Sequence, residues 1–134
     1  MFNKDDFYDR LQVWKDLRLE LETSPTPIKL LKDFYRQAPL VTIAADPYDQ
    51  DLWPNPWEQV EENIYCPFSI ILAMCYCLQL STRFSQSSIE IHIGTDEKRE
   101  QIIYCLLLDK RPIGLWDEDD TPNVISREVY DMTL

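Results

Sequence analysis

Hydrophobic residues repeat with a helical period in the first part of the chain and with a strand period beyond it. From Phe7 to Leu21 apolar residues recur at three- and four-residue spacing, which predicts an amphipathic helix that ends near Thr23. Thr26-Pro27 follows as a cap and a first-position proline, so a second helix begins here and closes at Pro39. The sequence therefore predicts that two helices open the chain.

A third helix and a fourth, far more apolar one are predicted next. Asn55 supplies a cap, Pro56 occupies the first position and Glu58 completes a capping box, three signals that mark one helix start. The stretch from Phe68 to Leu80 is apolar nearly all round, as in a helix that neighbours bury on most sides. We expect it to be the central helix, with Cys66 at its first turn.

The rest of the chain changes to a period of two, which indicates strands. Ile89 to Ile93 alternates apolar and polar positions and predicts a half-buried strand, after which Gly94-Thr95-Asp96 is expected to turn the chain. Ile102 to Leu108 is so apolar that we place it in the middle of the sheet. Ile113 to Trp116 predicts a third strand, and Val124 to Met132 a final short element.

These elements predict a single α+β domain over residues 1–134. N-terminal helices and a buried central helix are expected to pack on a small antiparallel sheet of about three or four strands. The segments are an N-terminal helical part at 1–39, an aromatic and acidic loop at 40–57, and the central helix with the sheet at 58–134. A chain of this length can bury a core of its own.

The charge of the chain narrows the choice of partners. Its 24 acidic and 13 basic residues give a formal net charge of −11 at pH 7. Binding to nucleic acid or to an anionic membrane needs a basic patch, so direct contact with either is not expected. A protein partner with a basic or apolar surface, within a larger assembly, fits this charge.

Four cysteines, at positions 66, 75, 77 and 105, lie in apolar segments, and we expect them to be buried and reduced. The first residues have neither the basic region nor the apolar region of a secretory signal. The stretch from Phe68 to Leu80 is shorter than the roughly 20 residues of a membrane span. An intracellular location is therefore expected.

Cys66 is the residue with the clearest candidate chemistry. The N-terminus of a helix presents free N–H groups and a partial positive charge, and both favour a thiolate. Trp57-Glu58, then Cys66 opening an apolar helix, then three strands make residues 53–118 resemble the core of transglutaminase-like and papain-like cysteine proteases. The resemblance implies that Cys66 is at the nucleophile position and Asp117 at the acid position. It also implies that Tyr104 occupies the position of the family's histidine.

Tyr104 decides how we interpret this site. A tyrosine, with a reference pKa near 10, cannot act as an imidazole does at neutral pH, so we expect a non-catalytic fold in which Cys66 is a cap or core thiol. The single histidine, His92, shares a strand face with Glu90 and is expected to point into solvent, away from Cys66. With one histidine and two glycines, no metal site, cofactor or phosphate loop is predicted.

Two surfaces are the candidates for interaction. The loop from Asp46 to Trp57 presents aromatics stiffened by prolines, a composition that suits the anchors of protein interfaces. The alternative is that its tryptophans pack on the central helix and hold the loop against it. The tail from Trp116 combines an acidic run with apolar residues, which would be exposed unless they fold back or meet another chain. The candidate contact residues are Tyr48, Trp53, Trp57, Asp46, Asp49, Asp51, Trp116 and Asp119.

A non-catalytic protein-protein interaction module is the function that these features favour. The runs 53–58, 63–66 and 78–80 make the chain similar to small uncharacterised proteins of tailed bacteriophages, notably those of cyanobacteria. That resemblance implies a structural role in the virion or its assembly, in the bacterial host cytoplasm or the virion. Two alternatives stay open: a thiol hydrolase or transferase of transglutaminase-like type that uses Cys66, and an inhibitor that mimics DNA with its acids.

Overall fold

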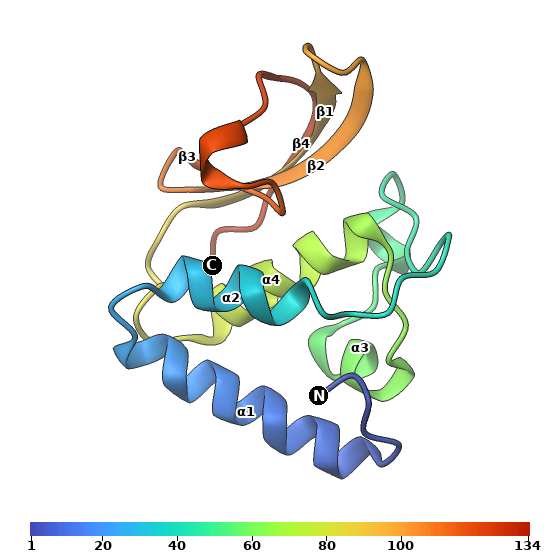
Figure 1. Cartoon of the computed structure of the whole chain (residues 1–134), viewed down its shortest axis with the longest axis vertical. Coiled ribbons are helices and arrows are strands. Elements are labelled where there is room, and N and C mark those ends of the chain that lie inside the picture. Colours follow the sequence, from blue (N-terminus) through green and yellow to red (C-terminus); the bar gives the residue numbers. More distant parts are fainter.

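Four helices pack on a four-stranded antiparallel sheet in the computed structural model, which describes residues 1–134 (Figure 1). The predicted α+β class is confirmed. The helices are α1 (Phe7–Thr23), α2 (Pro27–Tyr35), α3 (Pro56–Glu62) and α4 (Pro67–Leu80). The strands are β1 (Ile89–Asp96), β2 (Gln101–Leu108), β3 (Arg111–Ile113) and β4 (Val124–Asp131), and two short 3-10 turns are η1 (Gln50–Leu52) and η2 (Glu118–Asp120).

The predicted helix starts are confirmed, and their caps differ in kind. Asp6 caps α1 by accepting a backbone N–H from the first turn at 2.8 Å. Asn55 and Glu58 form the predicted capping box of α3, with hydrogen bonds of 2.9 and 2.8 Å. Thr26 makes no side-chain cap, so α2 starts on its first-turn proline alone, and it ends before the proline that was expected to close it.

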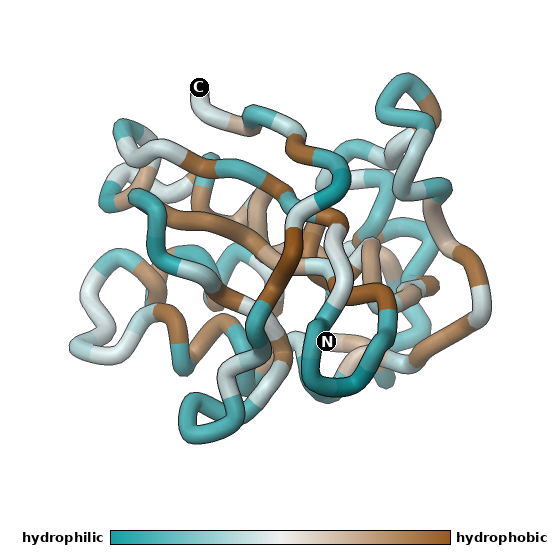
Figure 2. Tube along the Cα trace, turned by 90° about the horizontal axis from the view of Figure 1, so that it is seen from above, coloured by the Kyte–Doolittle hydropathy of each residue, from teal (hydrophilic) through white to brown (hydrophobic).

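α4 is buried on nearly every side, as its composition predicts. It contacts β1 and β2 as well as α2 and α3. The side chains from Phe68 to Leu72 are each at most 2% exposed. In Figure 2 hydrophobic stretches cross the middle of the trace, and hydrophilic turns lie around the periphery. The hydrophobic core is therefore built around this helix.

The strands run in the order β3-β2-β1-β4, so β2 lies inside the sheet as its apolar sequence predicts. Ile91 on β1 pairs with Leu106 on β2 and with Tyr130 on β4, which puts these three side chains on one face of the sheet. This face is the one that packs on α4, since Ile91 and Leu106 belong to the core. The final element is a full edge strand, and its end is held to α4 by a hydrogen bond of 2.6 Å from Gln79 Nε2 to the Met132 carbonyl oxygen.

The expected turn at Gly94-Thr95-Asp96 is wrong, because β1 continues to Asp96. The pairing of β1 with β4 is irregular between Ile93 and Gly94, and a β-carbon on Gly94 would lie 2.5 Å from the Ile125 carbonyl oxygen. Glycine is required here for the close approach of a neighbouring strand and not for a turn. The chain reverses after Asp96, whose carboxylate accepts the Lys98 N–H at 3.0 Å.

The third strand also lies earlier in the chain than predicted. β3 covers Arg111–Ile113 and not Ile113 to Trp116. A β-carbon on Gly114 would lie 2.0 Å from the Trp116 ring, so that ring folds back over the glycine. The residues that were expected to extend the strand therefore cover its end instead.

Arg10 is a buried charge that the apolar pattern of α1 does not reveal. The residue is 6% exposed. Its guanidinium donates to the carbonyl oxygens of Val60 and Glu61 at 2.8 Å, and to those of Lys4 and Asp5 at 2.8 and 3.0 Å. The carbonyls in the last turn of a helix have no partner within it, and a cation there also meets the negative end of the helix dipole. One side chain therefore joins the N-terminal segment, α1 and α3.

Replacing Leu72 by alanine is expected to lower the free energy of unfolding by about 2–5 kcal/mol, the range for cavity-forming truncations in a core. Leu72 is 0% exposed in α4, whereas Leu80 at the end of the same helix is 39% exposed. Leu80→Ala is the matched control and should cost less than about 1 kcal/mol. Urea denaturation measures both variants, and equal losses would contradict the central position of α4.

Replacing Arg10 by methionine is expected to cost about 2 kcal/mol or more, because the buried carbonyl oxygens that it serves lose their donor. Lys15→Met removes the same charge from an exposed position of α1 and is the control. It should change the unfolding free energy by less than about 0.5 kcal/mol. Thermal and urea unfolding distinguish the two, and a neutral Arg10→Met would show that the network adds nothing to stability.

Candidate functional site

Cys66 is the N-cap of α4, and the chain before it brings a second segment to its side. Asn63 ends α3 in the left-handed conformation, with φ of 51°. Tyr65 then forms a parallel bridge with the segment 40–45, in which the Val41 N–H donates to the Tyr65 carbonyl oxygen at 2.7 Å. The bridge lays this segment alongside the start of α4.

Groups from two segments of the chain set the pKa of the Cys66 thiol. Burial by itself would raise the pKa of Cys66, but hydrogen bonds from the backbone and hydroxyl of Ser69 and from the N–H groups of Ala44 and Ala45 outweigh it, and the pKa is lowered. The Ser69 hydroxyl also accepts the Cys66 N–H at 2.8 Å. The sequence favours a cap or core thiol for Cys66, and the structure places this thiol where its pKa is lowered.

The thiol opens on a cavity of about 510 Å³ with mostly apolar walls. Three side chains on its walls, Ile43, Tyr48 and Ile102, are 74%, 58% and 64% exposed. An apolar group of a ligand can therefore bind next to the sulfur. The residues that line the cavity are Thr42, Ile43, Ala45, Asp46, Pro47, Tyr48, Cys66, Pro67, Phe68, Ile102 and Tyr104.

Tyr104 lines this same cavity, so the structure brings together Cys66 and the residue at the histidine position. Its ring packs edge-on against Phe68, with 5.5 Å between the centroids. Burial and the neighbouring Tyr48 and Cys66 raise the pKa of Tyr104. The phenol is therefore protonated at neutral pH, where it donates hydrogen bonds and cannot take a proton from the thiol.

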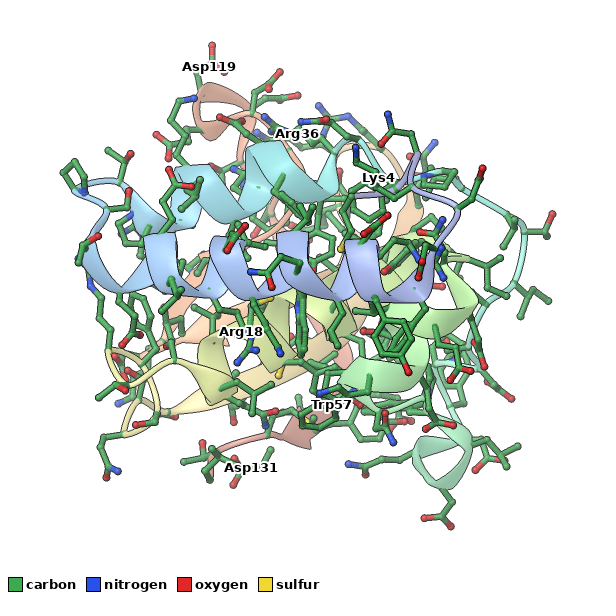
Figure 3. The ribbon with its side chains drawn as sticks, turned by 90° about the horizontal axis from the view of Figure 1, so that it is seen from below. Lys4, Arg18, Arg36, Trp57, Asp119 and Asp131 are labelled. Carbon is green, nitrogen blue, oxygen red and sulfur yellow. The ribbon has the colours of Figure 1, made fainter.

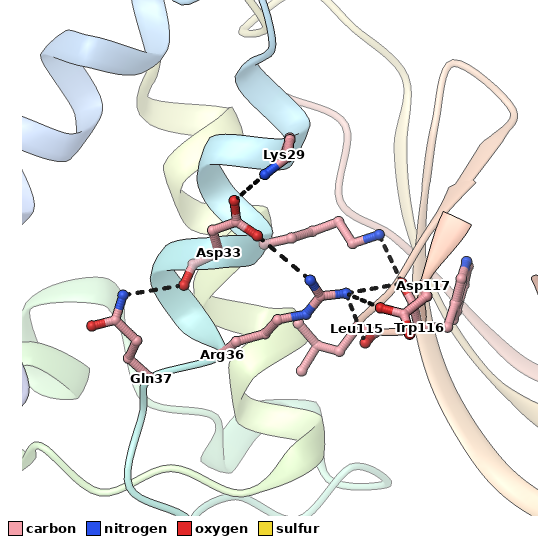
Figure 4. A network of polar contacts seen from close by, with 8 residues as sticks. Lys29, Asp33, Arg36, Gln37, Leu115, Trp116 and Asp117 are labelled. Carbon is pink, nitrogen blue, oxygen red and sulfur yellow. Dashed lines mark hydrogen bonds and ion pairs between the residues drawn. The ribbon is translucent and has the colours of Figure 1, made fainter. Parts of the chain in front are cut away.

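Asp117, implied at the acid position, does not join them. Its side chain is 81% exposed and lies 3.5 Å from the Arg36 guanidinium. Arg36 also donates to the carbonyl oxygens of residues 115–116 at 3.2 and 3.1 Å, and so fastens this segment to α2 (Figure 4). The acid that does line the Cys66 cavity is Asp46.

His92 lies away from Cys66 as predicted, but the expectation that it faces solvent is wrong. The residue is 8% exposed, with Nδ1 2.6 Å from Ser126 Oγ and Nε2 3.2 Å from Glu90 Oε1. The irregular pairing of β4 puts Ser126 on its face of the sheet. His92 pairs with Cys105, whereas the core-facing Ile93 pairs with Tyr104, so the sheet itself separates the imidazole from Cys66.

The other three cysteines are buried and unpaired. Burial raises the pKa of Cys105 to about 11 and also raises the pKa of Cys75 and of Cys77. Cys66 is therefore the one thiol of the four whose pKa is lowered. No group of three or more His, Cys, Asp and Glu side chains is arranged to hold a metal ion.

The aromatic loop divides into packed and exposed side chains. Trp53 packs against one ring of α4 and one of β4, at 5.1 and 4.8 Å between centroids, and its Nε1 donates to the Asp46 carbonyl oxygen at 2.7 Å. Trp53 therefore lies where it holds the loop against α4, which is the alternative to a contact with a partner. Tyr48 is 58% exposed, and Trp57 is 49% exposed while it packs edge-on against a ring of α1.

The remaining candidate contacts differ in exposure. Asp51 and Asp119 are exposed, and Asp49 and Trp116 are half-buried. In Figure 3 Asp119 and Asp131 lie at opposite edges of the molecule. These two acids therefore do not share one edge, whereas Asp46, Asp49 and Asp51 lie together in one loop.

No protein-family model and no curated protein matches the chain. Among solved structures, calcium-bound LapG of Legionella pneumophila superposes with a TM-score of 0.65 at 13% identity, covering 96% of this chain and 78% of that one. A second LapG structure gives a TM-score of 0.61 at 15% identity, over 90% and 68% of the two chains. EGTA-treated LapG gives 0.58 at 14% identity, over 92% and 63%.

The chain has a LapG-like fold. LapG is a transglutaminase-like cysteine protease, so the likeness supports the fold that the sequence resemblance implied. Identities of 13–15% support the fold alone, and they give no support to the resemblance to bacteriophage proteins. None of the helices has the length and apolar character needed to cross a membrane.

Cys66 is expected to be the first of the four thiols to react with iodoacetamide. Because its folded-state pKa is lowered, the rate should rise with pH and level off above a midpoint that lies below the roughly 8.5 of an ordinary thiol. Ser69→Ala removes a hydroxyl that helps to lower the pKa of Cys66 and should move the midpoint up. Mass spectrometry of the alkylated peptides gives the rates, with Cys105→Ser as the control variant, and a Cys66 midpoint at or above the ordinary value would contradict this assignment.

Proposed function

We propose that the chain is a thiol hydrolase or acyltransferase that uses Cys66 as its nucleophile. The observation that carries the proposal is the Cys66 thiol itself, at the first turn of α4, beside a cavity and with donors around its sulfur that lower its pKa. Such a setting activates a thiol toward carbonyl carbon. LapG, whose fold the chain shares, is a cysteine protease, so the fold is one that can carry such chemistry.

The absence of an imidazole from the cavity limits which leaving groups can be expelled. The thiolate attacks the carbonyl carbon, a C–S bond forms, and the bond to the leaving group breaks. An amine must take up a proton as it leaves, whereas the thiolate of a thioester leaves as it is. Acyl thioesters are therefore the substrates that this site favours, and amides should react more slowly.

Tyr104 has a role that its raised pKa permits. As a protonated phenol in the same cavity, it can donate a hydrogen bond to the oxyanion that develops on the carbonyl oxygen. It can also give its proton to a departing amine, but a phenol with a raised pKa is a weaker acid than an imidazolium, so amides still react more slowly than thioesters. Tyrosine thus replaces the acid function of a histidine only in part, and not its base function.

Release of the acyl group needs a second nucleophile and a proton acceptor. Water or an amine attacks the acyl-Cys66 carbonyl carbon, and the thiolate leaves. Asp46 lines the cavity, and its Oδ1 accepts the Tyr48 N–H at 2.9 Å while its Oδ2 accepts no hydrogen bond from the protein. Oδ2 is therefore available to take the proton of the attacking group.

The test is hydrolysis of a small aromatic thioester and of the matching anilide. Cys66→Ser should reduce thioester turnover to the background rate, and Cys105→Ser should leave it unchanged. Tyr104→Phe removes the oxyanion donor from both reactions and the acid from the anilide reaction alone, so it should slow both substrates, and the anilide about a hundredfold more than the thioester. Thioester turnover that survives in Cys66→Ser would exclude this function.

A protein-interaction module is a second candidate, favoured by the exposed apolar side chains of one region. Of the fourteen large hydrophobic residues that are exposed, half lie in residues 40–64. Exposed apolar side chains of this kind are what a protein partner can bury. Under this function a partner with a basic or apolar surface binds there, Leu52→Ser weakens the complex, and Cys66→Ser does not. Loss of binding in Cys66→Ser instead would tie the partner to the thiol site.

A further inference from the structure

A second cavity, of about 290 Å³, lies where α2 meets β3 and η2. Lys32 and Arg111 bring two positive charges to its walls, and Glu118 brings one negative charge. The remaining walls are largely apolar, from Ile28, Ile113 and Trp116. A chain with a net charge of −11 thus has a hollow in which cations are in excess.

Lys32 is buried without a full set of partners. The residue is 6% exposed, and its Nζ donates to the Trp116 carbonyl oxygen at 2.9 Å, its one hydrogen bond. An ammonium group has three donors, so two remain for a ligand. Burial and the nearby Arg36 lower the pKa of Lys32 more than the surrounding acids raise it. An anion placed beside the amine would therefore stabilise its charged form, which the protein alone stabilises incompletely.

Arg111 is also without an acidic partner, since its guanidinium makes neither an ion pair nor a hydrogen bond. The cations next to this cavity behave differently, because Lys29 and Arg36 both pair with Asp33 (Figure 4). Glu118 lies on the exposed η2 turn and forms an ion pair with neither cation. The two cations that face the cavity are thus the ones left for an external anion.

The apolar walls set the size and shape of the ligand. The Trp116 ring is held over Gly114, where any side chain would displace it. Ligand pockets commonly range from roughly 300 to 1,000 Å³, so this cavity is at the small end and suits a small molecule better than a peptide chain. An acid with a compact apolar body would fill it.

We propose that this cavity binds a small organic monocarboxylate, with its carboxylate on Lys32 and Arg111 and its apolar part against Ile28, Ile113 and Trp116. The site is separate from Cys66 and does not depend on thiol chemistry. Arginine and lysine both form charge-assisted hydrogen bonds with carboxylates, and a buried lysine makes the stronger contribution because solvent screens it less.

The test is a titration of the full chain with hydrocinnamate, followed by two-dimensional amide NMR. Saturable shifts are expected at Ile28, Ile113 and Gly114. Hydrocinnamamide, which has the same body without the charge, should bind at least about tenfold more weakly, the effect of losing one charge-assisted hydrogen bond. Acetyl-glycyl-phenylalanine presents the same carboxylate on a peptide and should bind more weakly than the free acid.

Three variants distinguish binding in this cavity from a nonspecific attraction of the anion to positive charge. Lys32→Met should weaken hydrocinnamate binding at least about tenfold, and Arg111→Met, at an exposed position, should also weaken it. Lys29→Met removes an equal charge from α2 outside this cavity and should leave affinity unchanged. Equal binding of acid and amide, equal losses in Lys29→Met and Arg111→Met, or tighter binding of the peptide would each overturn the proposal.

Discussion

The burial of α4 on nearly all sides is the constraint on which the rest of the structure depends. An apolar helix cannot present any flank to water, so the sheet covers one side, and α2 and α3 pack on others. At the N-terminus of α4 the first backbone N–H groups have no partner within the helix, and the neighbouring elements leave a cavity beside it. Cys66 lies at this end, so the lowered pKa of its thiol depends on how the segments around α4 pack.

Positive potential arises in two different ways in this acidic molecule. At Cys66 it comes mainly from backbone N–H groups, which carry no net charge and cannot be titrated away. At the cavity beside α2 it comes from the side chains of Lys32 and Arg111. The first arrangement stabilises an anion that the protein itself generates, and the second suits an anion that arrives from outside.

Helix starts could be predicted from the sequence because each depends on residues within one turn, as Asn55 and Glu58 demonstrate. The shared location of Cys66 and Tyr104 followed from the order of the elements. The donors from Ala44 and Ala45 could not be predicted, since a backbone amide leaves no mark in the sequence. Gly94 was misread as a turn because its true constraint, the approach of β4, comes from a distant segment.

The strand order also has a consequence for how the chain folds. β1 pairs with β2 on one edge and with β4 on the other, although β2 and β3 lie between β1 and β4 in the sequence. The β1–β2 hairpin is local and can form early, but the second edge of β1 stays open until residues 124–131 have paired with it. In that interval an apolar strand edge is available to other chains. A change that only delays the pairing of β4 would therefore promote aggregation during refolding without changing the stability of the finished fold.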